Sequence, residues 1–230
     1  MSKPLEILYE DNHLVIVNKG VSDIVESDKT GDESLEDRIK MFIKVRDKKP
    51  GNVFLGVSHR IDRPVSGAVV FAKTGKALVR LNEMFKNKEV RKKYWAIVRN
   101  EPPLQQDHLE HHLSRNSKQN KSYVRKNADA DTKLASLSYK LIGRSDNYFL
   151  LEIELHTGRH HQIRSQLAHI GCPIKGDLKY GAPRSNKNGG ISLHARSLQF
   201  MHPVGKAEIF IEAPPPGEDI FNQFKVSNPH

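Results

Sequence analysis

The order of strand-like and helix-like segments is the feature of this sequence that most limits its fold. Helical periodicity is confined to residues 33–49, 75–90 and 158–171. Strand-like runs occupy 5–10, 13–19, 68–72, 94–98, 135–144, 148–157, 191–203 and 206–214. Because helices and strands do not alternate regularly, the sequence predicts an α+β fold with a mixed, mostly antiparallel sheet flanked by helices.

The first two helical segments each carry an apolar face. Its expected members are Leu35, Ile39, Phe42 and Ile43 in the first, and Leu78, Leu81 and Phe85 in the second. Thr74 directly precedes the second segment and is expected to cap it, since a threonine hydroxyl accepts a backbone N–H at a helix start.

The length of 230 residues suits one hydrophobic core. We therefore expect residues 1–230 to form a single domain. Residues of about 100–132, which begin with Pro102-Pro103, are expected to form an extended or hairpin-like polar excursion, and residues 217–230 a C-terminal tail.

The location of the protein follows from three absences in the sequence. No run of roughly 18 apolar residues predicts a membrane-spanning helix. The N-terminal residues lack the apolar centre of a signal peptide. Cys172 is the one cysteine, so no internal disulfide can form. Together they predict a cytoplasmic protein without a membrane partner.

The net charge of +10 favours a polyanionic partner, with RNA ahead of DNA. The charge is also regional, as a surface that faces a polyanion requires. The basic residues gather in two groups: Lys86, Lys88, Arg91, Lys92, Lys93 and Arg99, and then Arg115, Lys118, Lys121, Arg125 and Lys126.

One carboxylate, Asp62, stands among His59, Arg60 and Arg63 in the stretch "SHRIDRPVSGAVVFAKT". Positive neighbours favour the ionised form of a carboxyl group. An ionised, partly shielded carboxylate can act as a nucleophile, a base or an anchor, and the stretch alone leaves these three roles open.

The second candidate cluster is the glycine-punctuated stretch from His156 to Ala182. Its spacing predicts a helix over 158–171 that ends at Gly171. The apolar face of this helix is expected to contain Ile163, Leu167 and Ile170. His160 and Arg164 are four residues apart and are expected to share another face. A guanidinium there suits a carboxylate or a phosphate.

Four motifs carry a resemblance to a known family. They read "HRIDRPVSG", "RKKYWAIV", "TGRHHQIRSQLAHIGCPIKGDLKYG" and "LHARSLQFMHP". In this order they resemble the RluA-type RNA pseudouridine synthases, and the similarity covers roughly residues 6–216. The resemblance implies a catalytic pseudouridine synthase domain with a central basic cleft, which isomerises specific uridines in ribosomal or transfer RNA.

The resemblance also implies roles for individual residues. Asp62 is the catalytic carboxylate, Arg164 its partner, and Tyr94 packs on the uracil and helps to move the C5 proton. Because Trp95 alternates with Tyr94 along one strand, Trp95 is assigned to the core. Ile163 forms an apolar floor, and Arg60 fills the gap left by a flipped-out base. The further residues expected to contact RNA are His59, which also braces the Asp62 loop, Lys92, Lys93, Arg159 and His160.

Three departures from the family pattern stand out: the first bears on the edge of the cleft and the third on target choice. The sequence has Asn18-Lys19-Gly20 where Asn-Lys-Pro is usual, and Val65 where a threonine is usual. The few residues before Leu5 predict a form without the small N-terminal RNA-binding domain that many relatives carry. We expect a monomer.

Other readings of the sequence remain open to test. The chain is also compatible with a non-catalytic RNA-binding or RNA-chaperone module on the same fold. A zinc deaminase is disfavoured, since the Cys-x-x-Cys and His-x-Glu signatures are missing. The reaction needs no cofactor and no metal, and loosely spaced histidines such as His108, His111 and His112 are expected to be structural or RNA-contacting.

Overall fold

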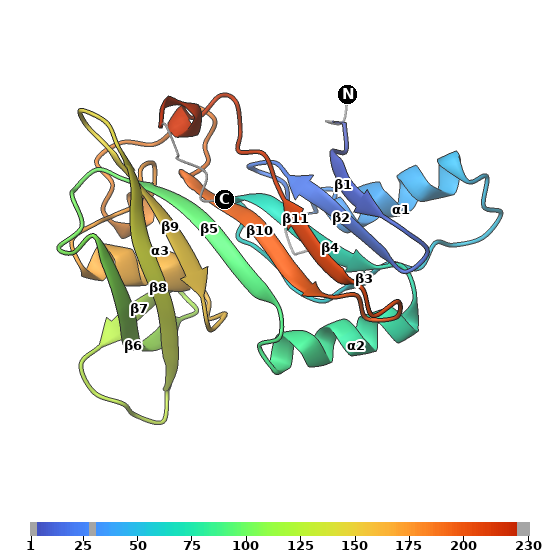
Figure 1. The fold of residues 1–230 in the computed structure, drawn as a ribbon, viewed down its shortest axis with the longest axis horizontal. Coiled ribbons are helices and arrows are strands. Elements are labelled where there is room, and N and C mark those ends of the chain that lie inside the picture. The colour runs from blue at the N-terminus through green and yellow to red at the C-terminus, as the bar shows by residue number, and fades with distance from the viewer. Residues whose placement is uncertain (1–3, 28–30, 225–230) are drawn as a thin grey trace. The chain divides into compact units, whose positions relative to one another are not determined.

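The computed structural model describes residues 4–27 and 31–224 (Figure 1). The chain forms two compact units. The first unit contains Met1–Arg91 and Ala195–Pro214, and the second contains Lys92–His194 and Pro215–His230. Each unit combines antiparallel strands with helices, which confirms the predicted α+β class.

The first unit is built on antiparallel strand pairs. Its strands are β1 (Ile7–Glu10), β2 (Leu14–Lys19), β3 (Gly56–Val57), β4 (Ser66–Ala72), β10 (Leu193–Met201, from Ala195 on) and β11 (Glu208–Glu212). The strand order is β1-β2-β4-β10, with β3 on β4 and β11 on β10. The paired strands β1–β2, β2–β4, β3–β4 and β10–β11 run antiparallel, and the strand runs predicted over 5–10, 13–19, 191–203 and 206–214 are confirmed.

Helices α1 (Leu35–Arg46) and α2 (Gly75–Lys86) complete the first unit. The hydroxyl of Thr74 accepts the N–H of Ala77 at 3.3 Å, which confirms the predicted cap. The apolar face of α2 packs against β2 and β4 in one cluster that includes Leu81 and Leu14. Both partly buried members of the predicted face, Leu78 and Phe85, also pack against this cluster.

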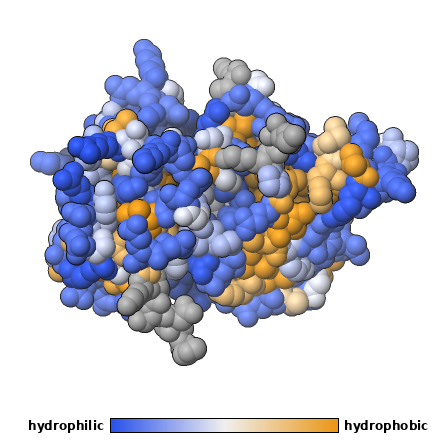
Figure 2. Space-filling model, turned by 90° about the horizontal axis from the view of Figure 1, so that it is seen from above, coloured by the Kyte–Doolittle hydropathy of each residue, from blue (hydrophilic) through white to orange (hydrophobic). Residues whose placement is uncertain are grey.

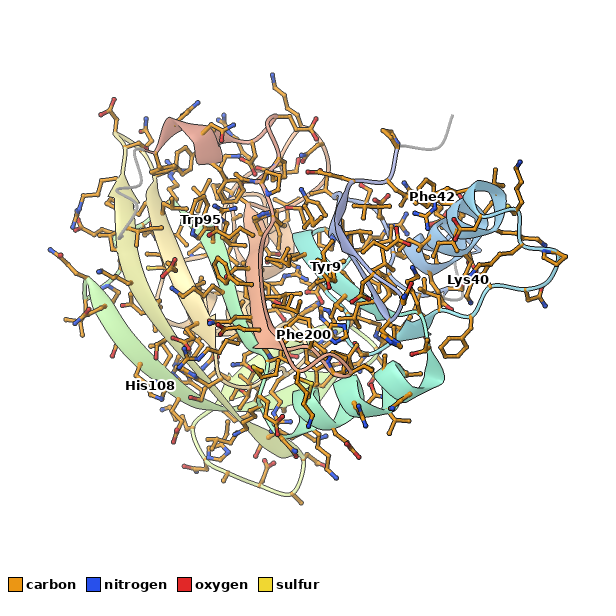
Figure 3. The ribbon with its side chains drawn as sticks, turned by 45° about the vertical axis from the view of Figure 1, so that its right-hand side comes forward. Tyr9, Lys40, Phe42, Trp95, His108 and Phe200 are labelled. Atoms are coloured by element: carbon orange, nitrogen blue, oxygen red, sulfur yellow. The ribbon has the colours of Figure 1, made fainter. Side chains whose placement is uncertain are left out.

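One predicted core position in α1 is wrong. Leu35, Ile39 and Ile43 are buried, but Phe42 is 36% exposed (Figure 3). Phe42 stands at the edge of the apolar stripe, where the guanidinium of Arg46 covers its ring at 5.1 Å. A cation–π contact of this kind holds an aromatic ring at the surface.

The second unit is a five-stranded antiparallel sheet with one helix. Its strands are β5 (Arg91–Val98), β6 (Gln106–Asn116), β7 (Lys121–Arg125), β8 (Thr132–Arg144) and β9 (Phe149–Leu155), in the order β5-β9-β8-β6-β7. The unit also contains α3 (Gln162–His169) and two 3-10 turns, η1 (Leu178–Tyr180) and η2 (Ile220–Gln223). The predicted polar excursion is a true hairpin, formed by β6 and β7.

The core of the second unit includes residues from the predicted C-terminal tail. Phe221 and Phe224 are 2% and 6% exposed and pack with Ile97 and Leu150. Trp95 packs against the same cluster, with its ring 6.5 Å from that of Phe221, which confirms its assignment to the core (Figure 3). The tail is therefore structural as far as residue 224, and its last residues, 225–230, lie outside the described residues.

Two surface properties complete the description. The face shown in Figure 2 is mostly hydrophilic, as expected of a chain with 28% charged residues. None of the helices within residues 4–27 and 31–224 is long and apolar enough to cross a membrane.

We expect Phe221→Ala to lower the free energy of unfolding of the second unit by about 3–5 kcal/mol, because it opens a cavity beside Trp95. The matched control is Leu104→Ala, which removes an apolar side chain that is 56% exposed and should change stability by less than about 0.5 kcal/mol. Urea titration followed by the fluorescence of Trp95, the one tryptophan, measures both. Equal losses in the two variants would contradict a structural role for the tail.

Candidate active site

The loop between β3 and β4 holds Asp62 at its centre. The carbonyl of Asp62 accepts the N–H of Val65 at 3.0 Å, which closes a tight turn. The carbonyl of the next residue, Arg63, accepts the N–H of Ser22 at 3.0 Å and the ammonium of Lys19 at 3.1 Å. Backbone contacts on both sides therefore fix the position of the half-buried Asp62.

Lys19 supports this loop, and it was not identified as a functional residue from the sequence. Its side chain is 1% exposed, although it ends a strand of apolar residues, and its Nζ also donates to the carbonyl of Gly20 at 2.8 Å. A buried ammonium is costly unless it is hydrogen-bonded. A sequence feature that could have identified it is the position of a lysine at the end of the apolar run "LVIVNK".

His59 and Gly67 brace the two ends of the same loop. The Nε2 of His59 accepts the N–H of Val70 at 3.0 Å, and its ring stacks on Phe85 with centroids 4.6 Å apart. His59 is therefore the brace that the motif predicts. Gly67 has φ +121°, and a Cβ there would lie 2.3 Å from the carbonyl oxygen of Ala195. Only glycine allows β4 to approach β10 this closely.

The two arginines beside Asp62 are paired with other acids. Arg60 forms an ion pair with Glu26 at 3.0 Å, and Arg63 with Asp32 at 2.8 Å. All four side chains are about half exposed or more. The expectation that positive neighbours keep Asp62 ionised stays a prediction.

Strand β5 separates Tyr94 from Trp95 by its alternation. Tyr94 stands opposite Ile153 of β9 and is 8% exposed. Lys92 shares the face of Tyr94, and its burial lowers the pKa of its ammonium below the ordinary value. Lys93 shares the face of Trp95 and forms a surface ion pair with Glu152 at 2.8 Å. Lys93 therefore belongs to a solvated face.

Helix α3 is shorter than predicted, and its polar side is not exposed. It begins at Gln162 after His161, which has a left-handed backbone with φ 51°. The Oε1 of Gln162 accepts the hydroxyl of Thr157 at 2.7 Å and the N–H of Arg159 at 3.0 Å, so residues 157–161 form a turn. The predicted helical face shared by His160 and Arg164 is therefore wrong.

Arg164 instead lies inside the second unit and is 5% exposed. Its Nε and Nη2 donate to the two carboxylate oxygens of Asp177 at 2.7 and 2.9 Å. Asp177 is 1% exposed, and the guanidinium stands 5.1 Å from the ring centroid of Tyr180. This two-point pair, which we call the Arg164–Asp177 pair, fixes the plane of the guanidinium.

Asp177 was missed as a functional residue, although "GDLKYG" was part of the recognised block. Spacing alone does not show that this acid meets Arg164. Asp62 belongs to the first unit and Arg164 to the second, and their predicted pairing stays a prediction. Ile163, beside Arg164 on α3, is buried at 5% exposed.

The β6–β7 hairpin is fastened to the segment that carries the Arg164–Asp177 pair. The hydroxyl of Tyr180 accepts the N–H of Ser122 at 2.8 Å and hydrogen-bonds Nδ1 of His161 at 3.0 Å. Lys179 donates to the carbonyls of Gln119 and Asn120 at 3.3 and 3.1 Å. The tip of the hairpin therefore has a fixed position relative to α3.

Two residues predicted to contact RNA are engaged in this scaffold. His160 hydrogen-bonds Ser122 through Nδ1 at 2.9 Å and Asn120 through Nε2 at 3.0 Å. Arg159 is exposed, and its Nε donates to the carbonyl of Leu134 at 2.9 Å. His160 thus anchors the hairpin, and Arg159 is an exposed residue with one backbone contact.

The histidines do not assemble a metal centre in the part of the chain that the structure describes. No group of three or more His, Cys, Asp or Glu side chains there is arranged to hold a metal ion. His108 and His156 instead share hydrogen bonds with Ser138 at 3.0 and 2.9 Å.

Comparison with known proteins shows which family this chain belongs to. A family model described as RNA pseudouridylate synthase matches residues 13–169. The chain is 32% identical to the ribosomal large subunit pseudouridine synthase D of Zymomonas mobilis subsp. mobilis, over 98% of this chain and 74% of that protein. It is also 32% identical to the tRNA pseudouridine synthase C of Salmonella typhi, over 91% of this chain and 85% of that protein.

Among solved structures, the fold is similar to that of human RNA pseudouridylate synthase domain containing 4. The TM-score is 0.80 at 22% identity, over 97% of this chain and 95% of that chain. At this identity the likeness concerns the fold.

We expect Asp177→Asn to lower the free energy of unfolding of the second unit by about 3–5 kcal/mol, because it removes the charge of the buried acid that binds the guanidinium at two points. Glu152→Gln makes the same acid-to-amide change in the partly exposed Lys93–Glu152 pair and should cost at most about 1 kcal/mol. Urea titration with Trp95 fluorescence compares the two. An Asp177→Asn variant as stable as Glu152→Gln would show that the pair does not hold the unit together.

His161 makes stability depend on pH. Burial, aided by the charge of Arg164, lowers the pKa of its imidazole from 6.5 to about 2, so the folded protein keeps it neutral. The unfolded chain binds the proton near pH 6.5, so this contribution is fully present above pH 6.5 and declines as the pH falls toward 2.

We therefore expect the wild-type protein to lose roughly 2 kcal/mol more stability between pH 7.5 and 5.0 than His161→Asn loses. Asparagine tolerates the left-handed backbone at this position. Chemical unfolding at the two pH values measures the difference. Parallel pH curves for the two proteins would rule out His161 as the titrating group.

Proposed function

The chain belongs to the RluA-type RNA pseudouridine synthase family, and from this premise we propose how its residues convert specific uridines in structured RNA to pseudouridine. The proposal makes Asp62 the catalytic carboxylate. It treats residues 1–230 as one catalytic domain that acts as a monomer in the cytoplasm, with RNA and not DNA as its partner. The observation that carries it is the buried Arg164–Asp177 pair within the family's own motif.

The reaction breaks the bond from N1 of uracil to C1′ of ribose and forms a bond from C5 to C1′. The proton on C5 is lost and N1 gains one, so no oxidant, metal or organic cofactor is required. Asp62 can attack C1′, attack C6 of the base, or assist elimination at the ribose. Each route needs a carboxylate that is ionised and held still, and the loop held by Lys19 and His59 supports this role.

Arg164 is proposed to be the counter-charge of Asp62. Nε and Nη2 of its guanidinium are bound to the two carboxylate oxygens of Asp177, which fixes the plane of the group. Such a group orients a carboxylate or a phosphate better than an ammonium does. The finding that Arg60 and Arg63 are paired with Glu26 and Asp32 makes Arg164 the better candidate.

The uracil is proposed to lie between Tyr94 and Ile163, both buried apolar surfaces of the second unit. The ring of Tyr94 packs on the base and its hydroxyl helps to move the C5 proton. A stacked uridine has to leave its helix to reach them. Arg60, whose side chain is 68% exposed, is proposed to stack in the vacated place.

Phosphate contacts are assigned to the β6–β7 hairpin and to the basic residues near β5. Lys121, Tyr123 and Arg125 all lie on β7. Lys121 stands 5.2 Å from the ring centroid of Tyr123, and Arg125 stands 5.7 Å from the same centroid. Such contacts hold cations in place without neutralising them. The relatives named above differ in their RNA, so we keep both ribosomal and transfer RNA as targets.

A non-catalytic RNA-binding module is the alternative function. Binding alone needs no acid in a basic environment and no buried arginine. The braces of Asp62 and the two-point anchoring of Arg164 therefore favour catalysis.

We expect Asp62→Asn to abolish isomerisation and to leave RNA affinity nearly unchanged, because phosphate contacts dominate binding. Arg164→Lys should retain part of the activity, at a rate roughly 10²- to 10³-fold lower, since an ammonium lacks the planar fork. Asp32→Asn is the matched control for an exposed acid of the same unit. The probe is total RNA from cells that lack the gene, with pseudouridine detected by mass-shift labelling. Wild-type turnover in Asp62→Asn would overturn the assignment.

A further inference from the structure

A second surface of the second unit has the composition of a nucleic-acid site. A hollow of about 1380 Å³ is lined by residues 99–100, 147–148, 173, 175–176, 181–188 and 218–220, all within this unit. Pockets for small molecules are usually about 300–1,000 Å³. The hollow therefore has room for more than one small ligand, as a segment of a polymer requires.

The charge in the hollow is mostly positive and mostly unpaired. Its lining contains four cations, Arg99, Lys175, Arg184 and Lys187, and two acids, Glu218 and Asp219. Asp219 forms an ion pair with Lys175 at 3.4 Å. Arg99, Arg184 and Lys187 are exposed, and none of them forms an ion pair within residues 4–27 and 31–224.

The floor of the hollow is built and rigid. Nζ of Lys175 donates to Oδ1 of Asn186 at 2.7 Å, and Nδ2 of Asn186 donates to the hydroxyl of Ser192 at 3.1 Å. That hydroxyl donates to Asp219 at 2.8 Å. Gly176, with φ +88°, lets Asn186 approach, since a Cβ there would lie 2.7 Å from its side chain. A preformed floor lowers the entropy cost of binding.

An aromatic ring lines the same hollow as these charges. Tyr148, in the turn before β9, is half-buried against the core of the unit and lines the hollow. Nζ of Lys175 lies 6.0 Å from its ring centroid. A ring next to several cations is the arrangement with which proteins bind single-stranded nucleic acid, because the ring stacks a base while the cations contact phosphates.

The hollow is separate from the residues proposed to bind the target uracil. Arg99 follows Tyr94 by five residues along and just beyond β5, which corresponds to roughly 16 Å of strand. We infer that this hollow binds a single-stranded segment of the substrate RNA outside the reacting nucleotide, with a base on Tyr148 and phosphates on Arg99, Arg184 and Lys187. The inference rests on the proposed function for its choice of RNA.

The direct test maps an RNA to this surface. The probe is a fluorescein-labelled 12-nucleotide oligouridine that carries 4-thiouridine, cross-linked by light and analysed by peptide mass spectrometry. We expect adducts on the peptide that contains Tyr148. Arg184→Glu should remove these adducts, weaken binding of the probe about tenfold at low salt, and lower the slope of log K against log salt by about 0.7.

The matched control is Lys49→Glu, which makes the same kind of charge reversal at an exposed lysine of the first unit. It should leave adducts and salt dependence unchanged. Equal effects of Arg184→Glu and Lys49→Glu, or the absence of any adduct at 99–100, 147–148 and 173–188, would overturn the inference. A competing experiment uses polyaspartate of equal charge. If polyaspartate binds as tightly as the RNA probe, and Arg184→Glu weakens its binding by the same factor, the hollow would be assigned to an acidic protein instead.

Kinetics separate this inference from the proposed function. With long structured RNA, Arg184→Glu should raise KM about tenfold and change kcat by less than about twofold, since it removes binding energy shared by ground state and transition state. A fall in kcat at constant KM would count against the hollow as a binding site. Activity retained in Asp62→Asn would refute the catalytic assignment and leave the cross-linking result standing.

Discussion

The Arg164–Asp177 pair is the interaction on which the second unit depends. It joins α3 to the segment before η1, and the ring of Tyr180 covers the guanidinium. The hydroxyl of Tyr180 then holds the β6–β7 hairpin through Ser122. Replacing a buried pair by apolar residues is often neutral, but removing one partner is costly. The pair is therefore better explained by the fixed orientation of Arg164 than by stability alone.

The first unit uses a different device to hold its carboxylate. Asp62 sits on a loop, and loops are mobile unless something holds them. Here the buried ammonium of Lys19 and the ring of His59 bind backbone groups of the loop and of β4. A reacting group has to be kept within about 0.5 Å of its working position, and rigid supporting contacts provide this. Lys19 of the Asn18-Lys19-Gly20 segment therefore supports the site.

Most strands, the cap at Thr74 and the identity of the family could be read from the sequence, because period-two runs, a threonine before a helix and the four motifs are local signals. The two-residue strand β3 and the Ser34 cap of α1 were not predicted. The start of α3 could not, since Gln162 binds Thr157 and Arg159 in a turn that competes with the helix. The partner of Arg164 was also hidden, because a buried ion pair depends on packing and not on spacing. Phe42 was predicted to be part of the buried face, but its ring is partly exposed and contacts the guanidinium of Arg46 at the surface.

The measurement that tests the central claim most directly is a double-mutant cycle on the single-turnover rate of pseudouridine formation. It compares Arg164→Lys, Asp177→Asn and the double variant with the wild-type protein. If Asp177 acts by orienting Arg164, the double variant should be about as slow as the slower single variant, because the two residues work as a unit. Rate losses that add in free energy would contradict this account and show that Asp177 acts independently of Arg164.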